Sequence, residues 1–334
     1  MLIGPPYWPK IMRRQVFTRL LSSLPKLSPH QLKKLNQAVG TLNQRQESRE
    51  ISAKRLNAHP ACPHCAHATF TKWGNTVGGA QRYRCGGCAR TFTALTGTPL
   101  ARVHAKTRLL DNAGLMALCL SVRKAAKQLG VHRNTAWSYR HHMMPLLESH
   151  QPHSLEGVLE ADEVFFRESF KGKKSGMPRV AYKRGSPATK RGVSTEQKAV
   201  LTAVARGSRA SLIAPLPSVP TRKSVADVLR PVVKKDAVLC SDSSSVYPKL
   251  KDDLGILVRQ IPRGMHSLGP YHINNVNALH SRMKRWLYPF RGVATKYLPG
   301  YLAWFQFFDM HRSAHASEEF LLDSFGALET NTIL

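Results

Sequence analysis

Two Cys-x-x-Cys pairs constrain the fold of this chain more than any other feature of its sequence. Cys62 and Cys65 form the first pair, and Cys85 and Cys88 follow after nineteen intervening residues. Four thiolates at this separation can surround one zinc ion tetrahedrally, and the glycines between the pairs are typical of turns that join short strands. Because protein fills all four positions, we expect a structural Zn²⁺ site in a zinc ribbon rather than a catalytic metal centre.

The charge of the chain restricts its partners. Fifty Lys and Arg residues against twenty Asp and Glu residues give a formal net charge of +30 over 334 residues. Such a charge opposes compact folding by self-repulsion unless a polyanion is the usual neighbour, so nucleic acid is the expected partner. On charge alone, a ribosomal-type or merely soluble basic protein remains the alternative. The length suits two or three domains of ordinary size.

The remaining cysteines and the apolar runs indicate the compartment. Four of the six cysteines lie in the two pairs, and Cys119 and Cys240 stand alone in apolar runs. This usage favours metal binding in a reducing compartment over a secreted disulfide framework. No stretch approaches the ~18 consecutive apolar residues that a membrane span requires. The first thirty residues carry Arg13, Arg14 and Arg19 between broken apolar runs and make a poor signal peptide. A cytoplasmic protein without a membrane partner is expected.

Residues 121–144 have the pattern of a tight helix-turn-helix. The small Ala126 allows two helices to cross closely, and Gly130 four residues later allows the turn. In such an arrangement the second helix, from about Arg133, enters the major groove of DNA. The residues expected near the DNA are His132, Arg133, Asn134 and Arg140.

From residue 154 the sequence changes to short, apolar, β-branched runs separated by helical segments, which predicts a mixed α/β domain. The predicted strands are 157–161, 199–205, 212–215, 237–240 and 256–261, and the predicted helices are 224–233 and 275–287. A basic segment rich in Gly, Pro and Ser separates the first two strands, and we expect a mobile arm that closes on phosphates, with a solvated loop as the alternative. Its candidate DNA contacts are Lys171, Lys173, Lys174 and Arg184.

Three side chains far apart in the sequence could meet at one magnesium site. Asp162 and Asp242 each end a predicted strand, and Asn277 lies in a predicted helix. Singly, each aspartate could be a cap or a turn residue. However, Lys284 lies seven residues after Asn277, ~20° away on one helix face, where it could hold a phosphate. Two-metal phosphodiester cleavage needs such oxygen ligands on rigid elements.

With these residues the chain resembles bacterial insertion-sequence transposases of the DDE type, in the family numbered 1595. The resemblance covers nearly all the chain through about Tyr301, and its specific parts are residues 161–172, 241–243 and 272–286. It implies a ribonuclease H-like catalytic domain. It also implies that Asp162 and Asp242 are the catalytic aspartates, Asn277 the third ligand and Lys284 the lysine seven residues beyond. The third position is commonly Glu in DDE enzymes at large, and several branches of this family look to carry Asn.

The resemblance sets expectations for activity and partners. It implies an enzyme that uses Mg²⁺ or Mn²⁺ to cleave a transposon end and to join the freed 3′ hydroxyl to target DNA. Double-stranded DNA is then the partner, in the bacterial cytoplasm and associated with the nucleoid. Because two ends are paired, a homodimer or larger assembly is expected, although no heptad seam indicates it.

Two alternative functions and four alternative ligands stay open. The chain could be a non-catalytic zinc-ribbon and helix-turn-helix regulator, or a ribonuclease H-like nuclease that does not join strands. If the register of the site is off by a step, the nearest substitutes are Glu160, Glu163, His272 and Asn274. Glu163 ranks lower because it should point to the opposite sheet face from Asp162.

The expected organisation has five parts. These are a helical segment at 1–57, a zinc ribbon at 58–100, a helix-turn-helix domain at 101–150, a ribonuclease H-like catalytic domain at 151–315 with a basic insertion at 167–196, and a tail at 316–334.

Overall fold

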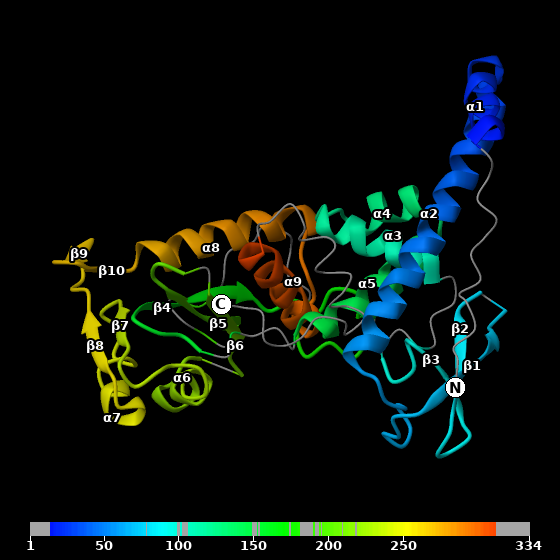
Figure 1. Cartoon of the computed structure of the whole chain (residues 1–334). Helices are drawn as coiled ribbons and strands as arrows, with labels where there is room; N and C mark the ends of the chain where they lie inside the picture. Colours follow the sequence, from blue (N-terminus) through cyan, green and yellow to red (C-terminus); the bar gives the residue numbers. More distant parts are fainter. Residues whose placement is uncertain are drawn as a thin grey trace. The chain divides into compact units, whose positions relative to one another are not determined.

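The structure is a computed structural model in which the chain divides into two compact units, Met1–Glu50 and Ile51–Leu334 (Figure 1). The residues that it describes are 14–77, 79–98, 101, 106–148, 152, 154–173, 175–180, 190, 194, 196–208, 210–217 and 219–311. The predicted contacts Lys174 and Arg184 and the expected tail at 316–334 lie outside them. None of the described helices is long and apolar enough to cross a membrane.

The described residues of the first unit are mainly helical. It contains α1 (Arg14–Ser23), a 3₁₀ turn η1 (Leu24–Lys26) and most of α2 (Pro29–Ala58). Ser28 and Gln31 form a reciprocal cap at the start of α2. The Ser28 backbone N–H donates to Gln31 Oε1 at 2.8 Å, and the Gln31 N–H donates to Ser28 Oγ at 3.3 Å. These bonds satisfy donors that a helix start leaves unpaired.

The second unit begins with a small antiparallel sheet that carries the cysteine pairs. Its strands are β1 (Phe70–Asn75), β2 (Gln81–Cys85) and β3 (Thr91–Thr93), in the order β1-β2-β3. Phe70 packs edge-on against Tyr83 and Phe92, with ring centroids 5.4 and 5.3 Å apart. Since three aromatic rings cannot by themselves make a large core, the cysteine cluster beside them is expected to supply further cross-linking.

Three helices follow: α3 (Lys106–Ala117), α4 (Val122–Leu129) and α5 (Arg133–Leu147). The expected pair of helices with a tight turn is present. Ser121 Oγ accepts from the Lys124 N–H to cap α4, and Gly130 ends it in the left-handed conformation with φ 61°. His132 Nδ1 then accepts from the Asn134 N–H at 3.3 Å and caps α5.

A five-stranded mixed sheet forms the second half of the unit, and all five predicted strands are present. Its order is β6-β5-β4-β7-β8; β4 pairs antiparallel with β5 and parallel with β7. The prediction for the end of the first strand was wrong. β4 continues to Arg167 because it pairs with β5 along its whole length, so Asp162 lies inside a strand. The strands are β4 (Val158–Arg167), β5 (Gln197–Ala205), β6 (Ser211–Pro215), β7 (Val238–Ser241) and β8 (Leu257–Gln260).

Helices cover both faces of this sheet, which lies between α6 and α8 in Figure 1. Residues of α6 and α7 pack with one face and residues of α8 and α9 with the other. Both predicted helices are present, and α9 was not predicted. The remaining elements are α6 (Arg222–Leu229), α7 (Leu250–Leu254), β9 (Ser267–Leu268), β10 (Tyr271–His272), α8 (Asn274–Leu287), η2 (Tyr288–Phe290), η3 (Thr295–Tyr297) and α9 (Leu298–Met310).

Helix α9 joins the sheet domain to the three helices. Leu302 and Phe305 pack toward the sheet, whereas Trp304 and Phe307 pack with buried residues of α3 and α5. The Trp304 indole N–H donates to the Met116 carbonyl at 3.2 Å. Helix α9 therefore contributes side chains both to the core of α3–α5 and to the core on one face of the sheet.

Gly130 and Gly114 provide a matched test of the turn between α4 and α5. A Cβ at either position would meet no atom within 4 Å, but Gly130 has a positive φ and Gly114 lies inside α3. We therefore expect Gly130→Ala to lower the free energy of unfolding by about 1 kcal/mol. Gly114→Ala should raise it by roughly 0.5–1 kcal/mol. Urea unfolding followed by far-UV circular dichroism measures both, and equal effects of the two would contradict the assigned turn.

Candidate active site

Asp162 and Asp242 lie level with each other on neighbouring chain segments. In the parallel pairing of β4 with β7, Glu160 is opposite Cys240, and the two aspartates follow two residues later on each chain. Adjacent strands lie about 4.8 Å apart. The two aspartates also interact electrostatically, because the charge of Asp242 helps to raise the pKa of Asp162. The structure thus brings together the two carboxylates that the sequence placed 80 residues apart.

Burial is the largest influence on the Asp162 carboxyl. It raises the pKa of Asp162 to about 6; the Glu163 N–H lowers this pKa, the charge of Asp242 raises it and Lys284 lowers it. That N–H donates to Asp162 Oδ1 at 2.8 Å. On Asp242, Oδ1 accepts from the Ser244 N–H at 3.0 Å, and Oδ2 makes no hydrogen bond within the described part of the chain. Each carboxylate therefore keeps an oxygen for a further ligand.

Glu163 lies on the other face of β4, as expected, but it is coupled to the same charges. Its Oε1 accepts from the buried Tyr247 hydroxyl at 2.8 Å. Burial raises the pKa of Glu163 to about 7, and the charges of Asp162 and Asp242 also raise it. The carboxyl groups of Asp162, Asp242 and Glu163 thus repel one another at one end of the β4 and β7 pair. This repulsion favours a bound cation or retained protons.

His280 of α8 contacts this cluster and was not predicted. Its Nε2 lies 2.6 Å from Thr202 Oγ1, and the Thr202 hydroxyl donates to the Asp162 carbonyl at 2.9 Å. Because that hydroxyl has one proton, His280 Nε2–H is the donor and Nδ1 carries a lone pair. Nδ1 lies 3.8 Å from Asp162 Oδ2. Burial, followed by the charge of Lys284, lowers the pKa of His280 to about 4, so the ring is neutral at pH 7.

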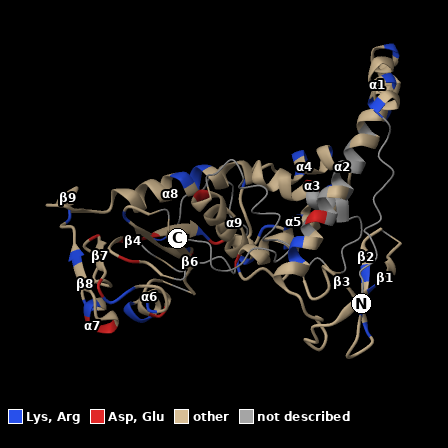
Figure 2. Ribbon diagram, viewed as in Figure 1, with Lys and Arg blue, Asp and Glu red and all other residues tan. Residues whose placement is uncertain are grey.

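Asn277 and Lys284 are on the same helix as His280. Both side chains are exposed, whereas Val276, Leu279 and Met283 are buried against the sheet. Residues three, four and seven apart share a helix face, so Asn277 and Lys284 flank the position of His280. The charge of Lys284 reaches both Asp162 and His280. Figure 2 marks the basic residues along α8 in blue.

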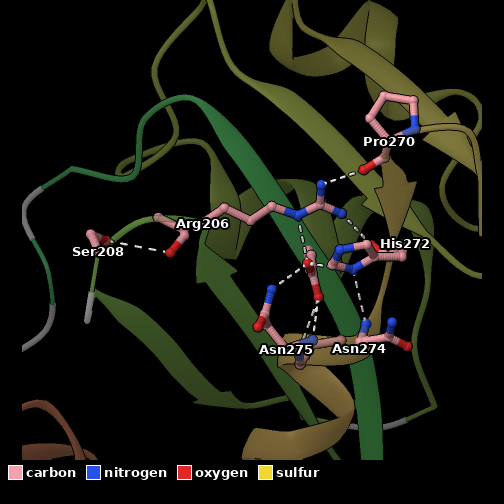
Figure 3. Close-up of polar contacts among 9 residues, drawn as sticks. Arg206, Ser208, Pro270, His272, Asn274 and Asn275 are labelled. Atoms are coloured by element: carbon pink, nitrogen blue, oxygen red, sulfur yellow. Dashed lines mark hydrogen bonds and ion pairs between the residues drawn. The ribbon is translucent and has the colours of Figure 1, made fainter.

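Glu160 fixes α8 to β4 and is fully buried. Its carboxylate accepts from Arg206 Nε at 2.7 Å, from the Asn275 N–H and side-chain amide at 2.7 Å each, and from the Val276 N–H at 3.2 Å. His272 Nδ1 lies 3.0 Å away. Figure 3 shows Arg206, His272 and Asn275 turned toward this point. Because its oxygens hold a helix start and a guanidinium, Glu160 is a structural residue here.

The four paired cysteines form a second cluster. Within the described residues they are a group whose ligand atoms all lie within 4.8 Å of one another, and they could hold a metal ion. The Cys62 and Cys88 sulfurs are 3.8 Å apart, and those of Cys65 and Cys85 are 3.6 Å apart. The backbone N–H groups of Cys88 and Gly87 donate to Cys85 Sγ, which favours its thiolate.

The predicted DNA-contact residues fall into three groups. His132, Arg133 and Asn134 are exposed at the start of α5. Arg140 does not lie with them on the exposed surface of α5, because it is 1% exposed and packs over the Trp304 ring, 4.8 Å from its centroid. Lys171 and Lys173 are exposed, and Lys171 Nζ also donates to the Arg291 and Gly292 carbonyls at 3.1 and 2.7 Å.

Residues 154–308 match the ISXO2-like transposase domain of the IS1595 family. The chain is also 27% identical over 250 residues to an uncharacterized protein in transposable element ISH50 of Halobacterium salinarum, across 73% of this chain and 83% of that protein. The mixed sheet fits a ribonuclease H-like domain of the kind expected above. On these matches residues 154–308 are similar to the transposase domain of the IS1595 family, and most of the chain is similar to a protein of a transposable element.

Two solved assemblies show weak overall likeness. One is a simian T-cell lymphotropic virus intasome in complex with a PP2A regulatory subunit, with a TM-score of 0.29, 8% identity and coverage of 59% of this chain and 68% of that chain. The other is a pre-cleavage Mos1 transpososome, with a TM-score of 0.27, 12% identity and coverage of 65% and 80%. Both scores are too low to support an inference.

The contacts of Glu160 predict a large stability effect. Glu160→Gln removes the negative charge that pairs with the Arg206 guanidinium. It also weakens the acceptor for the two N–H groups at the start of α8. The free energy of unfolding should therefore fall by about 3 kcal/mol. The matched control is Glu156→Gln, because Glu156 is exposed and its ion pair with Lys234 spans 4.0 Å. That change should cost less than about 0.5 kcal/mol. Equal urea midpoints for the two variants would show that Glu160 does not hold α8.

Proposed function

We propose that this chain is a transposase that binds the terminal inverted repeats of its element and performs metal-dependent DNA strand cleavage and strand transfer. The observation that carries the proposal is the meeting of Asp162 and Asp242 at one end of the β4 and β7 pair, beside the α8 face that presents Lys284. Two partly exposed carboxylates that repel each other cost stability, and a regulator without catalytic activity would gain nothing from them.

The donor set fits a divalent cation of the magnesium type. Asp162 and Asp242 would hold the ion with Asn277, since Mg²⁺ and Mn²⁺ prefer oxygen ligands. The fit rests on the raised pKa of Asp162, to which the charge of Asp242 contributes, because a cation would relieve that repulsion. When bound, divalent ions would activate the attacking oxygen and stabilise the leaving oxygen.

The protein's own groups have separate tasks in this proposal. Lys284 would bind a non-bridging phosphate oxygen and orient the scissile group. Neutral His280 would position the Asp162 backbone through Thr202, and because it adds no charge it would not compete with Lys284 for the phosphate. Asn277 supplies an amide oxygen without charge, so the site should hold its second ion less tightly than a site with three carboxylates.

Two bond exchanges complete the proposed reaction. Water attacks the phosphorus at the element end, the bond to the 3′ oxygen breaks, and a 3′ hydroxyl and a 5′ phosphate remain. That 3′ hydroxyl then attacks a target phosphate, and the target's own 3′ oxygen leaves. Since each step exchanges one phosphorus–oxygen bond for another, no covalent protein intermediate is needed.

The parts before the sheet would bind the DNA. The exposed start of α5, with His132, Arg133 and Asn134, would enter the major groove, and Lys173 would add phosphate contacts. Affinity should therefore fall steeply with salt. Pairing of two ends would require a homodimer or larger assembly.

Cleavage assays on the aspartates test the proposed reaction. In Mg²⁺, with DNA from the inverted repeats that flank the gene and a supercoiled target plasmid, Asp162→Asn and Asp242→Asn should each lower cleavage and joining at least about a hundredfold, because each removes a charged ligand. Asn277→Glu should keep the fold and measurable activity. Gel electrophoresis of end-labelled DNA separates cut from joined products.

The matched control is Asp236→Asn, an exposed aspartate just before β7. It should keep wild-type activity. Full activity of Asp242→Asn would overturn the assignment. Cutting without joined product would favour the nuclease alternative, and DNA binding without either would favour the regulator.

We also propose that the four-cysteine cluster holds structural Zn²⁺. Zn–S bonds of ~2.3 Å in a tetrahedron put the sulfurs ~3.8 Å apart, and the observed separations are 3.8 and 3.6 Å. The purified chain should contain one zinc, and Cys88→Ser should lose it and lower the thermal midpoint of the ribbon. Cys119→Ser is the control, because Cys119 instead accepts from the Trp286 indole N–H. Retention of zinc by Cys88→Ser, measured by atomic absorption, would contradict the assignment.

A further inference from the structure

A cavity of about 910 Å³ lies where α4 and α5 meet the loop that joins α8 to α9. Its volume is in the range of sites that hold a drug-sized ligand. Among the residues that the structure describes, five cationic side chains line it and no Asp or Glu does. Those cations are Arg123, Arg140, Lys171, Arg291 and Lys296. Such a cavity is suited to an anionic ligand.

Arg140 is the most buried of these cations, and two of its three guanidinium nitrogens have no hydrogen-bond partner. It is 1% exposed, and its Nη2 donates to the Leu120 carbonyl at 2.5 Å, while Nε and Nη1 have no hydrogen-bond partner. Burial lowers the pKa of the guanidinium, and the nearby Tyr301 hydroxyl offsets this only in part. A buried charge without a counter-ion is costly, so an anion in the cavity would stabilise the site.

Aromatic rings line the same cavity. Trp137 is 40% exposed, and its ring lies 4.1 Å from that of His141 and 5.6 Å from that of Tyr297. Burial lowers the pKa of His141 to about 4, so the ring is neutral, and its Nε2 is buried without a hydrogen-bond partner. A heterocyclic base could stack on Trp137 and supply a polar partner for His141.

The cavity continues the face of α5 that is expected to contact DNA. Arg133, Trp137 and Arg140 are spaced by four and three residues, so they lie along one strip of the helix. Lys296 also lines the cavity, and its Nζ lies 4.7 Å from the Tyr297 ring centroid. A DNA segment bound at the start of α5 would therefore lie beside the opening of a basic, aromatic cavity.

We propose that this cavity binds one unstacked nucleotide of an unpaired DNA strand end, with its phosphate held by Arg140 and Lys296 and its base stacked on Trp137. The proposal deepens the proposed function and rests on it, because it specifies which part of the DNA this region holds. A duplex cannot supply such a nucleotide until a base leaves the stack, so the cavity should distinguish strand ends from continuous duplex.

Fluorescence anisotropy with the full-length, zinc-loaded chain tests the proposal. The probes are a fluorescein-labelled duplex of about 20 base pairs with a thymidine overhang of about three nucleotides, and the same duplex with blunt ends. Trp137→Ala should weaken binding of the overhang DNA about tenfold and of the blunt DNA less than about twofold. Lys296→Gln should act in the same direction. Both residues are exposed, so both variants should fold.

Two control variants separate stacking and charge from general effects. Trp137→Phe keeps a ring to stack on and should bind the overhang within about threefold of the wild type. Lys249→Gln removes an exposed lysine that does not line the cavity and should leave the ratio of the two affinities unchanged. A 2-aminopurine in the overhang should be quenched by the wild type and not by Trp137→Ala.

Three results would decide against the proposal. Equal weakening of overhang and blunt DNA by Trp137→Ala would assign Trp137 to duplex binding. If inorganic phosphate competed as strongly as thymidine monophosphate, the cavity would bind the anion alone and would not recognise the base. Blunt-duplex binding by the wild type without any preference for the overhang would remove the nucleotide site. Failure to bind either DNA would instead contradict the proposed function.

Discussion

The buried carboxylate of Glu160 is the interaction on which the candidate site depends. It lies on β4 two residues before Asp162, on the same face of the sheet, and it accepts the first N–H groups of α8. Helix starts attract anions because their N–H groups are unpaired and the helix dipole is positive there. The contact of Glu160 with the start of α8 therefore fixes the position of α8 along β4, the strand that carries Asp162.

This geometry explains why residues more than a hundred positions apart act together. Glu160 holds α8 at Asn275, and five residues further along the helix His280 lies beside Asp162, with Nδ1 3.8 Å from Oδ2. Thr202 of the neighbouring strand β5 connects the imidazole to the strand backbone. The aspartate is thus held between a strand and a helix, and neither element is a flexible loop.

Much of this arrangement could be predicted from patterns that report local structure. The cysteine spacing predicted the small sheet, the apolar runs predicted all five strands of the large one, and the stripe of Val276, Leu279 and Met283 predicted α8. Helix α9 was missed because it is apolar nearly all round and has no amphipathic period to detect. The burial of Arg140 was missed for a related reason. Its environment is made by Trp304 and Phe290, which are distant in sequence, and no local pattern reports such contacts.

The polar residues around the aspartates show the same limit. Tyr247 and His280 acquire their roles through hydrogen bonds to Glu163 and Thr202 across the sheet. A lone tyrosine or histidine in sequence carries no sign of such a partner. Glu160 was an alternative metal ligand in the sequence analysis because it is close to Asp162 in the sequence. Its hydrogen bonds to Arg206 and to the start of α8 show that it is instead a structural residue.

The exposure of Asn277 has an evolutionary consequence. Its side chain makes no core contact, and the helix that carries it is held elsewhere by Glu160. An exchange between amide and carboxylate at this position would alter the charge of the centre by one unit while packing stays unchanged. If the proposed metal site is correct, selection could thereby adjust how strongly the site retains its divalent ions through a single residue.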